Sequence, residues 1–151
     1  MIIPFKYNQE TKTFSWFGKK KRDNTESSYQ IKGKRLVEEI INKALSDPRY
    51  KKYTNEVSKL NNGNVFIFEI SSWKEYLLSA LDWIHKGYSE YKIWLNYIPV
   101  ASDEDEWETL LMNIKSGNLY HTRSYHEFDT NLIRVTSIKN WIKSVPPPYE
   151  L

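Results

Sequence analysis

Residues 65–98, VFIFEISSWKEYLLSALDWIHKGYSEYKIWLNYI, decide the predicted fold, because the hydrophobic period changes twice within them. Residues 65–70 form a short apolar run of the kind found in buried strands. A serine followed three residues later by a glutamate then forms a capping box, which predicts a helix over residues 72–85. Residues 91–98 predict a second strand with large apolar side chains on both faces. It is either a central strand covered by helices or an edge strand that displays Trp94 to a partner.

Two more helices are predicted on the N-terminal side of this stretch. Apolar residues recur at every third or fourth position over residues 36–45, which is the pattern of one helix face. Asp47 and Pro48 supply an N-cap and a first-turn proline for a second helix. That helix ends at residues 61–63, Asn-Asn-Gly, where a glycine suits the C-terminal cap.

The C-terminal third predicts two helices and two weaker strands. A serine followed by consecutive acidic residues opens a helix over residues 102–114, where the acids favour the positive end of the helix dipole and need no ion. Residues 119–128 and 132–135 are weaker strands, and Ser137 caps a short helix that stops at the prolines of residues 146–148. The helix over residues 102–114 would bury Trp107, Leu110, Leu111 and Ile114.

Residues 1–30 predict a hairpin followed by a basic loop. The hairpin strands cover residues 2–7 and 12–17. The full order of elements is ββ-αα-β-α-β-α-β-β-α. This order predicts an α/β or α+β fold with a central mixed sheet and helices packed on it. We expect a single domain over residues 1–151, with a proline-rich tail at residues 146–151.

Composition restricts the class of protein. Aromatic residues make up 15% of the chain, and the absence of cysteine excludes disulfides and thiolate metal sites. No stretch approaches the roughly 18 to 20 apolar residues of a membrane span, and the first apolar run is too short for a signal peptide. Five glycines are too few to favour a nucleotide-cofactor fold. We therefore expect a cytoplasmic protein with no cofactor and no metal.

The formal net charge of +3 hides an uneven distribution. Residues 1–59 contain 14 Lys+Arg and 7 Asp+Glu, whereas residues 60–151 contain 8 and 12. Such a division can give the surface a pole that attracts acidic partners or phosphates. The alternative is that the opposite charges cancel where the two halves pack together.

The strongest basic cluster is Lys19, Lys20, Lys21 and Arg22, which lies near Trp16 and other aromatic residues. Lysines beside aromatic rings are typical of surfaces that bind single-stranded nucleic acid, with the charges on phosphates and the rings on bases. The same four residues would also serve as a nuclear-import signal. The alternative is a solvated loop whose aromatic neighbours turn into the core.

Residues 120–129 contain a candidate for metal-free catalysis, made of His121, Arg123, His126 and Glu127. A general acid and a general base that titrate near pH 7, with a cation beside the phosphorane, are what metal-free RNA cleavage requires. On a strand, His121 and Glu127 share one face and His126 lies on the other. The two histidines then need a bulge or a turn to serve one site, and the alternative is a polar edge strand or hairpin.

A second nuclease pattern is formed by Glu90 and Lys92, with Asp82 upstream. Metal-dependent nucleases place such carboxylates and a lysine on a strand, where the acids hold Mg²⁺ and the lysine positions the attacking water. One E-x-K is also expected by chance in a chain of which 27% is charged.

The tail contains Pro-Pro-Pro-Tyr at residues 146–149, which matches the PPxY pattern that WW domains bind as a polyproline II segment. Over these four residues the tail resembles the PPPY segments of viral matrix and Gag proteins, which recruit host budding factors. The alternative is a helix stop ahead of a short tail.

The sequence as a whole favours a non-enzymatic protein that binds a protein partner, of the immunity, antitoxin or virus accessory type. A Trp- and Tyr-rich chain without a catalytic motif suits tight recognition of one macromolecule. Because the chain is slightly basic, the acidic residues 103–108 would have to supply the face for a basic partner. The alternative is a nucleic-acid-binding protein or a small nuclease that cleaves phosphodiesters, and only that alternative calls for Mg²⁺.

Overall fold

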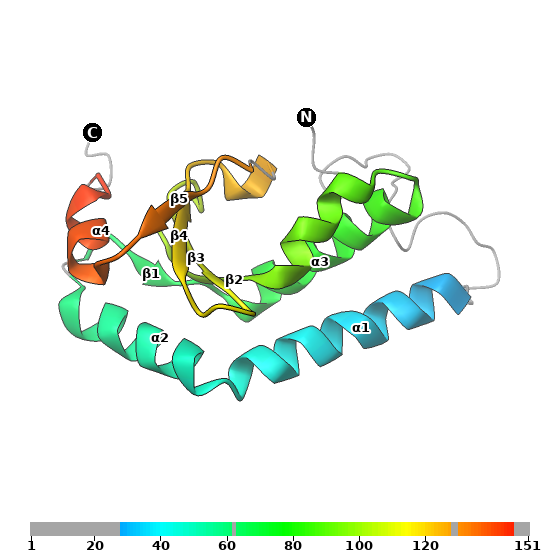
Figure 1. The fold of residues 1–151 in the computed structure, drawn as a ribbon, viewed down its shortest axis with the longest axis horizontal. Coiled ribbons are helices and arrows are strands. Elements are labelled where there is room, and N and C mark those ends of the chain that lie inside the picture. Colours follow the sequence, from blue (N-terminus) through cyan, green and yellow to red (C-terminus); the bar gives the residue numbers. More distant parts are fainter. Residues whose placement is uncertain (1–27, 62, 128–129, 147–151) are drawn as a thin grey trace. The chain divides into compact units, whose positions relative to one another are not determined.

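The structure is a computed structural model that describes residues 28–61, 63–127 and 130–146 (Figure 1). The predicted N-terminal hairpin, the basic cluster Lys19–Arg22 and the tail beyond Pro146 lie outside these residues.

Contacts between Cα atoms divide the chain into two compact units. Unit 1 contains the chain up to Asn42 together with Ile70–Leu95, and unit 2 contains Lys43–Glu69 together with the chain from Asn96 onward. The chain therefore passes from one unit to the other three times. The prediction of a single domain stays a prediction.

The described part of unit 1 is built around two helices. α1 (Ser28–Leu45) begins in this unit, and α3 (Ile70–His85) lies beside it. An ion pair of 2.7 Å joins Lys74 Nζ to Glu38 Oε2, so the two helices are linked through charged side chains. The buried apolar side chains of α3 include Trp73, Tyr76, Leu77 and Ala80.

Only the C-terminal end of α3 lies where the sequence predicts it. The helix begins at Ile70, so Ser72 lies inside the first turn and the predicted capping box is wrong. The helix stops at His85 as predicted, because Gly87 follows with φ 105°, a left-handed conformation that glycine adopts without a steric penalty.

The predicted strand over residues 91–98 is wrong. Ser89–Asn96 is a 3₁₀ helix, η2, and the strand β2 (Tyr97–Ser102) starts only after it. Tyr91 and Trp94 are both buried, and a spacing of three residues puts two side chains on the same side of a 3₁₀ helix. A short run with large apolar side chains on all sides fits a buried strand and a buried helical segment equally well, which explains the error.

Unit 2 contains a five-stranded sheet among the described residues, and each strand pairs with the next one along the chain. Every pairing is antiparallel, which replaces the mixed sheet of the prediction. Short connections join β2 to β3 and β3 to β4, whereas α3 and η2 lie between β1 and β2. The predicted class, helices packed with one sheet, is confirmed. The strands are β1 (Phe66–Ile67), β2, β3 (Thr109–Asn113), β4 (Leu119–Thr122) and β5 (Ile133–Val135).

The predicted buried strand over residues 65–70 is an edge strand of two residues. Phe66 and Ile67 are 48% and 37% exposed, whereas the flanking Val65 and Phe68 are buried. Phe68 N donates a hydrogen bond of 3.1 Å to Val100 O, so the segment stays attached to β2.

The predicted helix over residues 102–114 is instead a β-hairpin, in which β2 and β3 are joined by residues 103–108. Leu110, Leu111 and Met112 are all fully buried, which three consecutive residues achieve in a strand covered on both faces. Consecutive acids before an apolar run therefore mark a loop here and not a helix N-terminus.

Two helices of unit 2 begin where the sequence predicts. Asp47 caps α2 (Pro48–Leu60) by accepting a hydrogen bond of 2.8 Å from Arg49 N. Ser137 caps α4 (Ile138–Ser144) by accepting one of 3.1 Å from Asn140 N. The apolar side chains that the two helices bury are Tyr50, Val57, Ile138, Trp141 and Ile142.

Candidate functional site

The loop between β2 and β3, residues 103–108, has the sequence DEDEWE and is called the acidic loop below. It carries five carboxylates within six residues. Two backbone hydrogen bonds close it: Asp103 N donates to Glu108 O over 3.1 Å, and Glu106 N donates to Asp103 O over 3.2 Å. The loop is therefore a hairpin turn with a defined conformation.

The Asp103 side chain accepts hydrogen bonds from the backbone of the acidic loop and so fixes its conformation. Its Oδ1 accepts hydrogen bonds from Trp107 N at 2.8 Å and from Glu108 N at 3.3 Å. Glu104 and Asp105 are exposed, and the Trp107 side chain is 43% exposed. An indole thus lies at the surface beside carboxylates while its own backbone is fixed.

Glu106 carries backbone strain. Its φ is 63°, and it is the one non-glycine residue with positive φ among the described residues. The left-handed region costs an ordinary L residue about 1–2 kcal/mol. The next loop, residues 113–118, uses Gly117 at φ 76° for its left-handed residue, and Asn113 Oδ1 caps Lys115 N and Ser116 N there.

Glu108 anchors the acidic loop to the neighbouring strand. His121 Nε2 lies 2.7 Å from Glu108 Oε1, and Arg123 Nε lies 3.6 Å from Glu108 Oε2. The side chains of Glu108 and His121 are 16% and 18% exposed, whereas Arg123 is 75% exposed. The Trp141 ring packs edge-on against the imidazole at 6.5 Å between centroids. The carboxylate thus orients a mostly covered histidine beside an exposed cation.

The structure brings together only part of the predicted histidine site. His121 and Arg123 meet at Glu108, which sequence reasoning missed because it lies across the β3–β4 pairing and not within the same segment. The predicted strand over residues 119–128 stops at Thr122, and η3 (Tyr125–Glu127) follows. His126 and Glu127 therefore do not continue the strand face that carries His121, and the shared face that we predicted for Glu127 is wrong.

The predicted metal pattern is not assembled. Glu90 and Lys92 lie exposed in η2 and not on a strand. Asp82 is buried in α3, where Oδ1 accepts a hydrogen bond of 2.9 Å from Tyr29 Oη and Oδ2 lies 3.0 Å from Lys86 Nζ. Burial first, and then the hydrogen bond to Asp82, raise the pKa of Tyr29 above its usual range. Within the described ranges, no group of three or more His, Asp or Glu is arranged to hold a metal ion.

The predicted partner-binding residues fall into two groups. Trp94 is 1% exposed, so the indole that an edge strand would have displayed is buried because its segment forms η2. Lys19, Lys20, Lys21, Arg22 and Trp16 lie outside the described residues.

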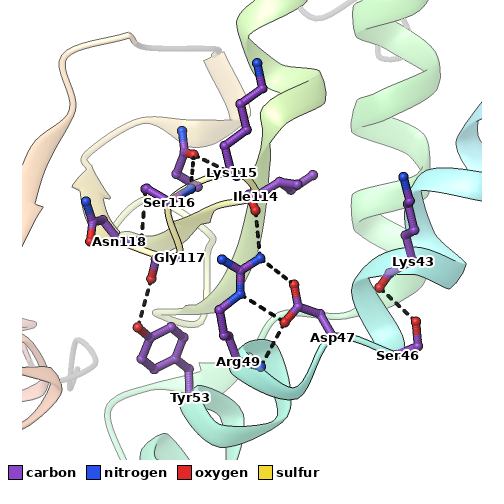
Figure 2. A network of polar contacts seen from close by, with 11 residues as sticks. Lys43, Ser46, Asp47, Arg49, Tyr53, Ile114, Lys115, Ser116, Gly117 and Asn118 are labelled. Atoms are coloured by element: carbon purple, nitrogen blue, oxygen red, sulfur yellow. Dashed lines mark hydrogen bonds and ion pairs between the residues drawn. The ribbon is translucent and has the colours of Figure 1, made fainter.

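A polar network at the other end of β3 fixes the loop of residues 113–118 to α2 (Figure 2). Arg49 donates to both oxygens of Asp47, at 3.1 and 2.7 Å, and to Ile114 O at 2.7 Å. Tyr53 Oη donates to Gly117 O at 2.8 Å. The hydrogen bond from the Arg49 side chain lowers the pKa of the Asp47 carboxyl. Every group in this network is used to hold the loop, so we assign it a structural role.

No protein-family model, curated protein or solved structure matches this chain. Among the described residues, no helix combines the length and the apolar character that crossing a membrane requires.

Proposed function

We propose that this chain is a non-enzymatic binding protein that recognises a basic protein partner through the acidic loop, in the manner of immunity, antitoxin or virus accessory proteins. The observation that carries the proposal is the Trp107 side chain, 43% exposed on a loop whose backbone Asp103 holds in place. Tryptophans at the centre of an interface are frequent hot spots, because they bury a large area at little cost in conformational entropy.

The exposed charges of the acidic loop indicate that the partner has a basic surface. Glu104 and Asp105 are exposed, while Asp103 and Glu108 are used within the fold. Exposed carboxylates around an aromatic anchor complement lysine- and arginine-rich surfaces and accelerate encounter with them. Phe66 pairs in register with Ser102, the last residue of β2 before the loop, and adds a second exposed aromatic side chain at this end of the sheet.

The test compares the wild-type chain with Trp107→Ala. Proteins retained by the immobilised wild-type chain are purified, and their dissociation constants with the wild-type chain and with the variant are measured by calorimetry. We expect Trp107→Ala to weaken binding by about 2 kcal/mol, or roughly 30-fold. Tyr88→Ala, at an aromatic residue of unit 1 that is 47% exposed, is the matched control. A partner that binds Trp107→Ala as tightly as wild type would contradict the proposal.

A phosphodiesterase is the second candidate, because Glu108 orients His121 at 2.7 Å beside the exposed Arg123. This arrangement offers a base and a cation for the developing phosphorane. The chain is incubated with labelled RNA and DNA, with and without Mg²⁺. Cleavage that His121→Ala abolishes would establish this candidate, and absence of cleavage would remove it.

A further inference from the structure

The outer face of α2 is basic and contains a groove. Tyr50 and Val57 turn into the core, so the opposite side of the helix faces outward. A shallow groove of about 550 Å³ follows this side and is lined by Pro48, Lys51, Lys52, Asn55, Glu56 and Lys59. We call its three lysines, Lys51, Lys52 and Lys59, the lysine face.

The charges of the lysine face are not neutralised within the fold. In the part of the chain that the structure describes, none of the three ammonium groups forms an ion pair. Glu56 is the single acid in the groove, so its lining carries a net positive charge. Lys52 and Lys59 are seven residues apart on the same side of the helix, which separates them by roughly 10 Å along the axis.

We propose that the lysine face binds the phosphodiester backbone of a nucleic acid. Interfaces with nucleic acid are polar and positively charged, and lysines contact phosphates as point charges. A protein-binding groove would need apolar or aromatic side chains at its centre, and a membrane-binding helix would need them to enter the lipid. The lining offers only Pro48, whereas the Asn55 side chain adds a neutral donor for phosphate oxygens.

The test measures the binding of a fluorescent oligothymidylate to the full chain by anisotropy over a range of salt concentrations. The variant replaces Lys51, Lys52 and Lys59 by glutamine. The control replaces Lys115, Lys139 and Lys143, which are exposed lysines of unit 2, and changes the net charge by the same amount. Three lost phosphate contacts should reduce the slope of log K against log salt by about 2, at roughly 0.7 for each contact with a single strand. Between about 50 and about 200 mM salt, wild-type binding should then weaken roughly 15- to 20-fold more than binding by the variant.

Glu56→Gln gives a change of opposite sign, which a loss of folding could not produce. Removing the single acid of the groove should strengthen oligothymidylate binding by about threefold, the effect of one screened surface charge. Equal salt slopes for the lysine-face variant and its control would overturn the proposal. So would absence of oligothymidylate binding at low salt, equal affinity for polyglutamate, or displacement by anionic lipid vesicles.

Discussion

Glu106 adopts a left-handed backbone conformation, which favours glycine, and it lies on the acidic loop that carries the exposed Trp107. Residues held in such conformations persist when their surroundings over-determine them, and they concentrate at binding sites. Here the Asp103 carboxylate and the pairing of Asp103 with Glu108 fix the loop on both sides of Glu106. Their hydrogen bonds hold a conformation that the glutamate alone would not choose.

Glu106→Gly should therefore increase the stability of the protein. The variant relieves about 1–2 kcal/mol of left-handed strain and loses about 0.5–1 kcal/mol through the greater entropy of glycine in the unfolded chain. We expect a rise of about 0.5–1 kcal/mol in the free energy of unfolding, measured by urea denaturation. Glu104→Gly, at a position without positive φ, is the control and should not stabilise. A lower stability of Glu106→Gly would show that the glutamate side chain contributes more than its strain costs.

Asp47 makes part of the stability dependent on pH. Its pKa is lowered chiefly by the hydrogen bond from the Arg49 side chain, so the folded state favours the charged carboxylate. This contribution is complete above the unfolded pKa, near 4, and is lost as the pH falls through the folded pKa.

Asp47→Asn should remove this dependence, because asparagine preserves the N-cap acceptor but not the charge. We expect the variant to be less stable than wild type at pH 7 and the difference to shrink below about pH 4. Urea denaturation over a series of pH values measures both curves. A difference that is unchanged at acidic pH would mean that Asp47 acts through geometry alone.

At the scale of elements, the loop of residues 113–118 depends on the close packing of Gly117 against Arg49. A Cβ added at Gly117 would lie 2.9 Å from Arg49 Nη1 and 3.0 Å from its Cδ. Arg49 cannot move aside freely, because it donates to Asp47 and to Ile114 O. The hairpin and the first turn of α2 are thereby held together.

Gly117→Ala should lower the free energy of unfolding by at least about 1 kcal/mol through its φ of 76°, and by more through the contact with Arg49. A double-mutant cycle with Arg49→Ala separates these two effects. The part of the loss due to backbone conformation remains in the Arg49→Ala background, and the steric part disappears. We expect a coupling energy of about 0.5 kcal/mol or more, and additive losses would contradict the close contact.

Several helix ends that are encoded locally were predictable from the sequence, although the capping box at Ser72 was not one of them. The caps at Asp47 and Ser137 and the stop at Gly87 use one residue and its immediate neighbours, and all three are confirmed. The acidic loop was not predictable, because consecutive acids satisfy a helix dipole and a hairpin turn equally well. Only the pairing of β2 with β3 distinguishes the two structures.

Only part of the candidate site was predictable, because its residues come from segments that are separate in the sequence. His121 and Arg123 were chosen for their chemistry, but their shared partner Glu108 ends the acidic loop directly before β3, in a segment for which we predicted a helix. Cross-strand register fixes that contact, and no local spacing reports it.

At the scale of the whole molecule, the uneven charge of the sequence persists on the surface of unit 2. The lysine face comes from the basic half of the sequence and the acidic loop from the acidic half, and both belong to this unit. Both carry exposed charged side chains, so the halves do not cancel one another at these two places. One unit therefore offers surfaces of opposite sign, which suits two partners of opposite charge.

The three passages of the chain between the units have a consequence for cutting and recombining the protein. Residues 43–69 leave unit 1 after Asn42 and return to it at Ile70, so neither unit is a continuous piece of sequence. A single cut at any of the three passages therefore separates neither unit from the whole of the other, because one fragment always contains residues of both units. Any continuous fragment that contains one unit whole also carries a segment of the other: residues 1–95 bring Lys43–Glu69 with unit 1, and residues 43–151 bring Ile70–Leu95 with unit 2.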